Sequence, residues 1–186
     1  MAQVKFNPAL ESFVGQVGGL IYKTRNGRRY VSRKPDYTHL RFNDAQKEVH
    51  QRFARATRYA KVVMADPRAR TPYDAAAKEK GASVQNLIVA DYMGVPSVDE
   101  IDMREYNGQA GGKILIRASD DFEVTRVDVV ISGPTGEEIE KGETIRSSMS
   151  GDCWVYTATV TVSAPVHVSV TATDRPGNQT TKVKSP

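Results

Sequence analysis

The chain has 186 residues, of which 39% are hydrophobic and 26% charged, a composition typical of globular rather than disordered proteins. Its net charge of +4 conceals an asymmetry, because residues 1–80 carry 17 Lys/Arg against 7 Asp/Glu, whereas residues 91–186 carry 9 against 15. Halves of opposite sign favour head-to-tail association or contact with a polyanion. The apolar runs are too short for a membrane-spanning helix, and the lone Cys153 excludes an internal disulfide.

The N-terminus does not read as a secretion signal. It lacks the basic region followed by an apolar core that a Sec signal peptide needs. We therefore expect synthesis and folding in the cytoplasm, without membrane insertion. Release as part of a virion-like or extracellular assembly stays open.

A β-hairpin is predicted near the N-terminus, after an extended arm over residues 1–12. The runs Leu20–Arg25 and Arg28–Arg33 flank Asn26-Gly27, which is a strong hairpin signal because both central positions of a type I′ turn need positive φ. In the register of a two-residue turn, Tyr22 lies opposite Val31 and Lys23 opposite Tyr30. An isolated hairpin is marginally stable in water, so we expect it to pack on another surface.

Three helices are predicted after the hairpin. The first begins at Asn43 or Asp44 and ends before Pro67, and it carries one apolar stripe formed by Val49, Phe53, Ala56, Ala60 and Val63. The second runs from Tyr73 to Lys80, with Thr71 as its N-cap and Pro72 at its first position. The third follows Ser83 and ends before Gly94.

Residues 113–184 have the pattern of an antiparallel β-sandwich. Segments with period-2 alternation are separated there by Gly, Pro, Asp and Asn, namely Lys113–Asp121, Val127–Ile131, Trp154–Val162 and Val166–Asp174. Residues 94–112 are rich in glycine and are expected to be a linker and the entry to the sandwich. The predicted fold class is α+β, with an arm, a basic hairpin and helices over residues 1–94 and the all-β sandwich over residues 95–186.

Two strings in the C-terminal region match a known type of domain. They are Ala118-Ser-Asp-Asp121 followed by Val124 and Val127, and Val170-Thr-Ala-Thr-Asp-Arg-Pro-Gly-Asn178 before the last strand. Through them the region resembles bacterial immunoglobulin-like domains of the cadherin or fibronectin III type. The resemblance implies an immunoglobulin-like fold and says almost nothing about function, because the same sandwich hosts many roles.

The N-terminal region matches a second pattern at Gly15, Gly18, Tyr22, Gly27, Arg33, Pro35, Gln46, Arg52 and Phe53. It resembles an uncharacterised bacterial family of small structural proteins of phage or phage-like particles. Members of that family open with a glycine-rich strand and hairpin and continue, after a proline, into a helix bearing Gln and Arg-Phe. The resemblance implies a structural role and supplies no catalytic residue.

The cations of the hairpin leave two functions open. Tyr22 and Tyr30 are interleaved with Lys23, Arg25, Arg28, Arg29, Arg33 and Lys34. Cations contact phosphate and aromatic rings stack on bases, so nucleic-acid binding is one interpretation. In the other, the hairpin is an assembly interface whose cations pair with an acidic neighbour such as Glu137, Glu138, Glu140 and Glu143.

Calcium is the candidate metal. Asp120, Asp121, Asp174 and Asn178 are placed at strand ends on one edge of the sandwich, and such oxygen ligands suit Ca²⁺. The alternative is that these residues form turns. The histidines His39, His50 and His167 have no metal-ligand spacing, and no phosphate-binding loop or nucleophile elbow is present. We therefore expect no enzyme activity and no other cofactor.

The sequence favours a non-enzymatic structural protein that self-assembles into a particle, tube or filament. A homo-oligomer built by heterologous contacts is expected, with an interface formed by Phe13, Leu20, Tyr22, Arg25, Arg28, Arg29, Tyr30, Arg33, Glu137, Glu138 and Glu140. One alternative is a binding module that recognises glycan or protein through the sandwich loops around Asp120, Gly133–Gly136 and Arg175–Asn178. The other is a nucleic-acid binder acting through the basic hairpin.

Overall fold

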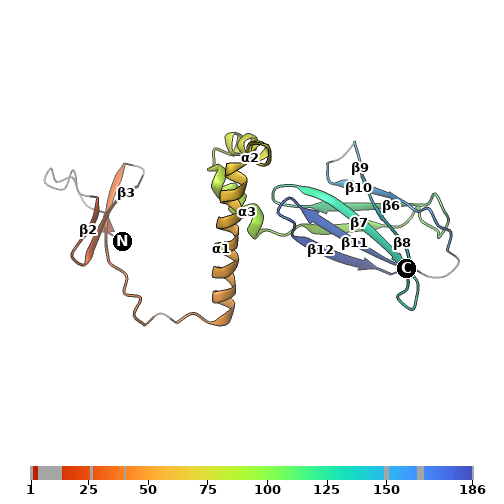
Figure 1. The fold of residues 1–186 in the computed structure, drawn as a ribbon, viewed down its shortest axis with the longest axis horizontal. Coiled ribbons are helices and arrows are strands. Elements are labelled where there is room, and N and C mark those ends of the chain that lie inside the picture. The colour runs from red at the N-terminus through yellow and green to blue at the C-terminus, as the bar shows by residue number, and fades with distance from the viewer. Residues whose placement is uncertain are drawn as a thin grey trace. The chain divides into compact units, whose positions relative to one another are not determined.

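The protein is a mixed α+β chain, as predicted, with its strands in antiparallel sheets (Figure 1). A computed structural model describes residues 2–3, 14–25, 27–39, 41–148, 151–162 and 166–185. By internal contacts the chain divides into two units, Met1–Lys47 and Glu48–Pro186. The boundary predicted after residue 94 separates helices from strands instead, and it stays a prediction.

The first unit is built on a four-stranded antiparallel sheet. Its strands β1 (Ala2–Gln3), β2 (Gly15–Val17), β3 (Leu20–Arg25) and β4 (Arg28–Arg33) lie in the order β1-β4-β3-β2. The predicted hairpin register is confirmed, with Tyr22 opposite Val31. Gly27 has φ of 70°, the left-handed conformation that the turn requires. Asn26 and residues 4–12 of the predicted arm are outside the described residues.

The first helix, α1 (Asp44–Ala65), has the predicted bounds. Its start is a capping box, because the Gln46 amide donates to Asn43 Oδ1 at 2.8 Å and the Asn43 amide donates to Gln46 Oε1 at 3.0 Å. The predicted apolar stripe is wrong at its N-terminal end. Ala56, Ala60 and Val63 are buried, whereas Val49 and Phe53 are each 55% exposed.

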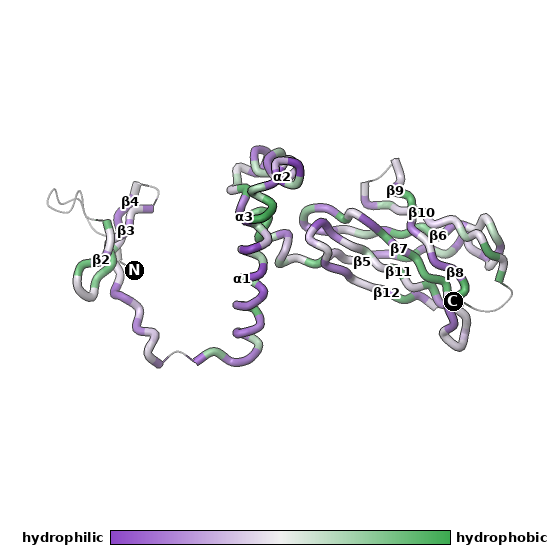
Figure 2. The backbone as a smooth tube through the Cα atoms, viewed as in Figure 1, coloured by the Kyte–Doolittle hydropathy of each residue, from purple (hydrophilic) through white to green (hydrophobic). Residues whose placement is uncertain are grey.

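The second helix, α2 (Pro67–Lys80), begins earlier than predicted. Asp66 is its N-cap and accepts a hydrogen bond from the Arg68 amide, which leaves Pro72 inside the helix rather than at its start. Gly81 ends α2 in the left-handed conformation, as the sequence predicts. The third helix, α3 (Val84–Met93), is confirmed and is the hydrophobic helix of Figure 2, whereas α1 and α2 are mainly hydrophilic.

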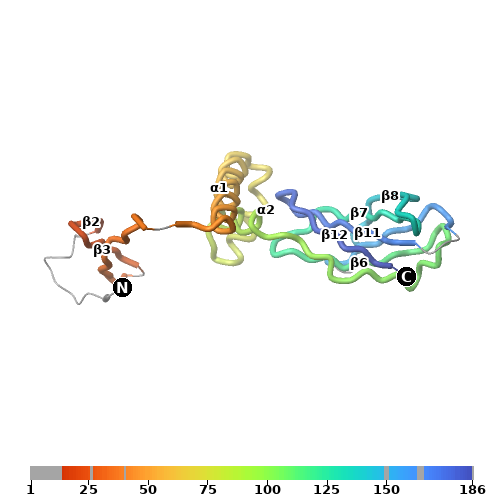
Figure 3. Tube along the Cα trace, turned by 90° about the horizontal axis from the view of Figure 1, so that it is seen from below, coloured from red at the N-terminus to blue at the C-terminus, as the bar shows by residue number. Residues whose placement is uncertain are grey.

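The remaining strands form two four-stranded antiparallel sheets, of orders β5-β6-β10-β9 and β12-β11-β7-β8 (Figures 1 and 3). They are β5 (Ser97–Asp102), β6 (Lys113–Ser119), β7 (Val124–Ser132), β8 (Glu138–Glu143), β9 (Ile145–Arg146), β10 (Cys153–Thr157), β11 (His167–Asp174) and β12 (Gln179–Lys184). The prediction of a linker over residues 94–112 is therefore wrong for Ser97–Asp102. Cys153 is a half-buried free thiol in β10.

The two sheets share one apolar core. Inward side chains alternate with outward ones along each strand, as the regular burial pattern of β11 shows. The core includes fully buried residues from both sheets, among them Ile114, Ile116, Val127, Val129, Val168 and Val170. Burying each such side chain contributes about 1.5–3 kcal/mol, so this core holds the two sheets together.

Side chains also close the two open sides between the sheets. On one side, Lys182 Nζ on β12 donates to Val98 O at 3.0 Å, and Lys184 Nζ donates to Ile101 O at 2.6 Å on β5. On the other side, Glu140 of β8 accepts hydrogen bonds from the segment after β10. Each edge therefore has side-chain hydrogen bonds that cross from one sheet to the other.

Candidate functional site

The described residues of the first unit's sheet form no buried core. Across residues 14–25, 27–39 and 41–47, which the structure describes, no residue is buried. A sheet normally gains its stability by burying one face. The first unit is therefore a sheet with a face open to a partner.

The two faces of this sheet differ in chemistry. Alternate residues of a strand, and residues directly opposite on neighbouring strands, share a face. The observed pairings Val17↔Leu20 and Tyr22↔Val31 define an apolar face, composed of Val17, Leu20, Tyr22 and Val31. Val17 is 49% exposed and Leu20 is 39% exposed.

The opposite face is basic. The pairs Arg25↔Arg28, Lys23↔Tyr30 and Ile21↔Ser32 lie on it, and we call its charged and aromatic part, Lys23, Arg25, Arg28 and Tyr30, the basic face. Arg29 and Arg33 project from the apolar side instead, where they lie opposite Thr24 and Leu20. The predicted interface residues of the hairpin are thus split between two faces, and Phe13 lies outside the described residues.

The glutamates predicted to pair with the hairpin cations are only partly at the surface. Glu138 is exposed on β8, and the neighbouring Glu137 accepts a hydrogen bond from the Thr135 hydroxyl. Glu140 is 7% exposed and engages Tyr156, Thr159 and Val160. This burial removes Glu140 from the predicted interface, because its carboxylate is already used inside its own chain.

The residues predicted for calcium are used in turns. Asp120 Oδ2 accepts from the Phe122 amide at 3.0 Å, and Asp174 Oδ1 accepts from the Gly177 amide at 2.8 Å. Asn178 Nδ2 donates to Asp174 Oδ2 at 2.7 Å, and Asp121 is exposed. Within the described part of the chain, no three His, Cys, Asp or Glu residues form a group suited to a metal ion. Calcium binding stays a prediction.

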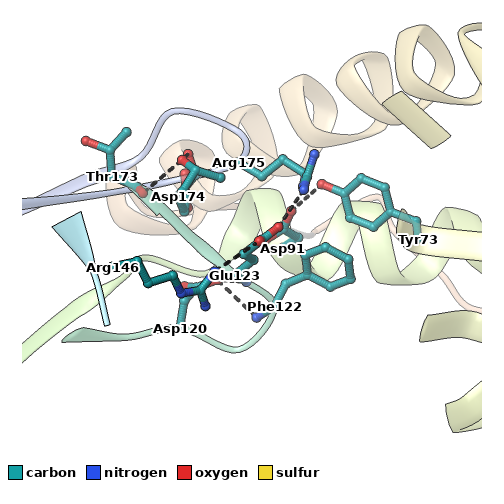
Figure 4. Close-up of polar contacts among 10 residues, drawn as sticks. Tyr73, Asp91, Asp120, Phe122, Glu123, Arg146, Thr173, Asp174 and Arg175 are labelled. Atoms are coloured by element: carbon teal, nitrogen blue, oxygen red, sulfur yellow. Dashed lines mark hydrogen bonds and ion pairs between the residues drawn. The ribbon is translucent and has the colours of Figure 1, made fainter. Parts of the chain in front are cut away.

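Two of these aspartates border a buried polar cluster that the sequence did not reveal (Figure 4). At its centre, Asp91 of α3 is 3% exposed and accepts a hydrogen bond from the Tyr73 hydroxyl of α2. The Tyr73 ring stacks on Phe122, with centroids 4.4 Å apart. Glu123 pairs with both Arg146 and Arg175 beside them. The cluster joins the helices to the turns of the sheets, and its signal in the sequence is a lone aspartate in the apolar run of α3.

Burial, together with the neighbouring carboxylates Asp120 and Asp174, raises the pKa of Asp91 to about 6, despite the hydrogen bond from Tyr73 and the charge of Arg175. The folded state therefore takes up a proton between about pH 4 and pH 6, and this contribution to stability is lost as the pH rises through about 6.

Relative to Asp91→Asn, we expect the wild type to gain about 2–3 kcal/mol of unfolding free energy between about pH 7 and about pH 4. Urea denaturation of both proteins at the two pH values measures this difference. Asp121→Asn, at an exposed neighbouring position, is the control that should leave the pH dependence unchanged. A constant difference between wild type and Asp91→Asn would contradict the assignment.

Comparison with known proteins adds little. No protein-family model matches the chain, and no curated protein matches it. Among solved structures, CopC from Methylosinus trichosporium OB3b is similar with a TM-score of 0.36 and 8% sequence identity, over 50% of this chain and 89% of that chain. A similarity of this size carries no argument about fold or function.

Proposed function

We propose that the protein is a non-enzymatic structural subunit that self-assembles through the sheet of its first unit. The observation that carries the proposal is a four-stranded sheet without a buried residue among those described, with Val17, Leu20, Tyr22 and Val31 along one face. Covering that face with a neighbouring copy supplies the burial that the sheet lacks. The first unit is then ordered most fully in the assembled state.

The edge strands of the sheet can also orient the contact between copies. β2 and β1 are the edge strands of the order β1-β4-β3-β2, and an edge strand can pair with a strand of another chain. A contact between unlike surfaces repeats from copy to copy and gives a ring or an open filament. A particle, tube or filament of a phage-like kind is the form we propose.

We also propose that the two sheets of the second unit form an immunoglobulin-like domain, which the assembly displays. Their strand order supports this, because naming β5 to β12 as A, B, C, C′, D, E, F and G gives the sheets A-B-E-D and G-F-C-C′. These are the strand neighbours of immunoglobulin domains.

The alternative of a glycan- or protein-binding module loses support. It relies on three loops, of which those at Asp120 and Arg175–Asn178 pack against the helices, whereas the loop Gly133–Gly136 is exposed at residues 134–136. Phe122 stacks on Tyr73 beside the first loop, and Asn178 Nδ2 donates to Tyr92 O of α3 at 3.3 Å. Surfaces already covered by the same chain are poorly placed to receive a ligand.

Self-association can be tested on the apolar face. Light scattering and negative-stain electron microscopy of the purified chain should reveal regular assemblies, and the double variant Val17→Ser, Leu20→Ser should remain monomeric. The matched control is Ile145→Ser, Val183→Ser, at exposed apolar positions (78% and 60%) of the second unit, which should assemble like wild type. A wild-type protein that stays monomeric at high concentration and low salt would overturn the proposal.

A further inference from the structure

We propose that the basic face of the first unit, composed of Lys23, Arg25, Arg28 and Tyr30, binds the phosphate backbone of a nucleic acid. This goes beyond self-assembly, which we assign to the opposite, apolar face. Three independent observations carry the proposal. They are the absence of ion pairs, the cross-strand arrangement of like charges and the aromatic ring among the cations.

The cations of the hairpin and Lys34 after it are not neutralised by the described part of the chain. No ion pair joins a described residue to Lys23, Arg25, Arg28, Arg29, Arg33 or Lys34. Between Val14 and Pro35 the sequence has no Asp or Glu at all. These charges are therefore available to an anionic partner.

The arginines in the two sheets of the second unit behave differently. Every arginine after residue 97 forms an ion pair, namely Arg104, Arg117, Arg126, Arg146 and Arg175. These pairs use Glu100, Asp102, Glu123, Asp128 and Glu143, and Glu140 is buried. Exposed carboxylates such as Glu105 and Glu138 form no ion pair with a described residue. The preference for a polyanion over a second copy therefore rests on the arrangement of the cations and on the ring of Tyr30.

The arrangement of the charges points the same way. Arg25 and Arg28 are directly opposite on β3 and β4, and like charges in such a pair repel each other. An anion placed between them removes the repulsion. Lys23 follows two residues along the same face of β3, about 7 Å from Arg25, so the face presents cations in a row, as a chain of phosphates requires.

The remaining member of the face is aromatic. Tyr30 lies directly opposite Lys23 and is half-buried, so its ring is partly accessible beside a cation. Basic grooves that hold single strands combine these two features, since the cations follow the backbone and the ring stacks on a base. An acidic protein surface offers carboxylates but no base for the ring.

Fluorescence anisotropy with a short labelled DNA of mixed sequence, single-stranded and duplex, tests the proposal on the full chain. Three cations on the face predict a salt slope for duplex DNA of about −3, which is a loss of affinity of about 40-fold between about 50 and about 200 mM salt. The double variant Arg25→Ser, Arg28→Ser should lose at least about tenfold in affinity and reduce the slope to about −1.

The matched control is Arg55→Ser, Arg68→Ser, at exposed arginines of α1 and α2, which should bind DNA like wild type. Equal loss in the control would show that only net charge matters and would overturn the assignment to this face. Absence of binding by wild type at low salt would overturn the proposal altogether.

Light scattering on the same variants separates this inference from the proposed assembly. Arg25→Ser, Arg28→Ser should assemble normally while losing DNA. A variant that loses assembly as well would place the basic face in the contact between copies, with an acidic protein surface as its partner, and would contradict the inference. DNA binding by a wild type that never assembles would support the inference and overturn the assembly proposal.

Discussion

Replacing Tyr73 by alanine should lower the unfolding free energy by about 3–5 kcal/mol. The side chain is fully buried, it stacks on Phe122, and its hydroxyl donates to Asp91. Truncation leaves a cavity between α2 and the turn before β7, and it also leaves a buried carboxylate without its donor. Urea denaturation followed by circular dichroism measures the loss.

The Tyr73→Phe variant distinguishes the contribution of the ring to stability from that of the hydroxyl. It keeps the stacking and should cost about 1–3 kcal/mol through the unpaired Asp91. A Tyr73→Ala variant within about 1 kcal/mol of wild type would mean that the helices contribute little to the stability of the second unit, contrary to their packing.

The second large effect is expected at Glu140. Its carboxylate accepts from the Tyr156 hydroxyl at 2.8 Å, from the Thr159 amide at 2.6 Å and hydroxyl at 2.7 Å, and from the Val160 amide at 3.3 Å. Glu140→Ala leaves the buried Tyr156 hydroxyl and the partly buried donors of Thr159 and Val160 without their acceptor, so it should cost about 3–4 kcal/mol of unfolding free energy. Thermal and urea unfolding both report this cost.

Glu138→Ala is the matched control on the same strand, because Glu138 is exposed, and it should change stability by less than about 0.5 kcal/mol.

The pH dependence of stability provides a second test of the role of Glu140. Burial raises the pKa of Glu140, but the hydrogen bonds from Thr159, Tyr156 and Val160 outweigh it, so the net pKa is lowered. The carboxylate therefore stabilises the fold above the ordinary pKa of glutamate, about 4.3, and loses this contribution as the pH falls below it. Equal acid sensitivity of wild type and Glu140→Ala would contradict this role.

Local chemistry made much of the fold predictable. Asn26-Gly27 fixes a two-residue turn, and the turn alone sets the hairpin register, which is observed from Leu20↔Arg33 to Arg25↔Arg28. Alternation identified the central strands β6, β7, β10 and β11, because each buries one face. The edge strand β5 was missed, since its stretch Ser97–Asp102 is rich in carboxylates and lies next to Gly94 and Pro96.

Errors arose where tertiary packing decides between local options. Asp66 and Thr71 both precede a proline, so either can cap α2, and the structure uses Asp66. The periodic stripe of α1 is longer than its buried part, because Val49 and Phe53 are 55% exposed, and Phe53 borders an open pocket beside α3. Periodicity shows which residues share a face and does not show how far the neighbouring element reaches.

The residues of the candidate site were also predictable only in part. The cations and aromatic residues of the hairpin were identified from sequence, because strand alternation and register place them without further information. The roles of Glu140 and Asp91 were not, since an acidic residue in a strand or helix gives no sign of whether its partners lie within hydrogen-bonding distance. Burial of a charge depends on contacts between distant segments, such as Glu140 with Thr159.

The lysines of β12 affect how neighbouring domains can pair at high local concentration. Lys182 and Lys184 occupy carbonyl oxygens of Val98, Asp99 and Ile101 along β5, so an incoming strand finds those acceptors taken. In a dense array of copies, neighbouring domains meet at high local concentration, where exposed edges fuse into amyloid-like sheets. In the assembly we propose, sealing this edge keeps neighbouring domains separate and leaves growth to the surfaces of the first unit.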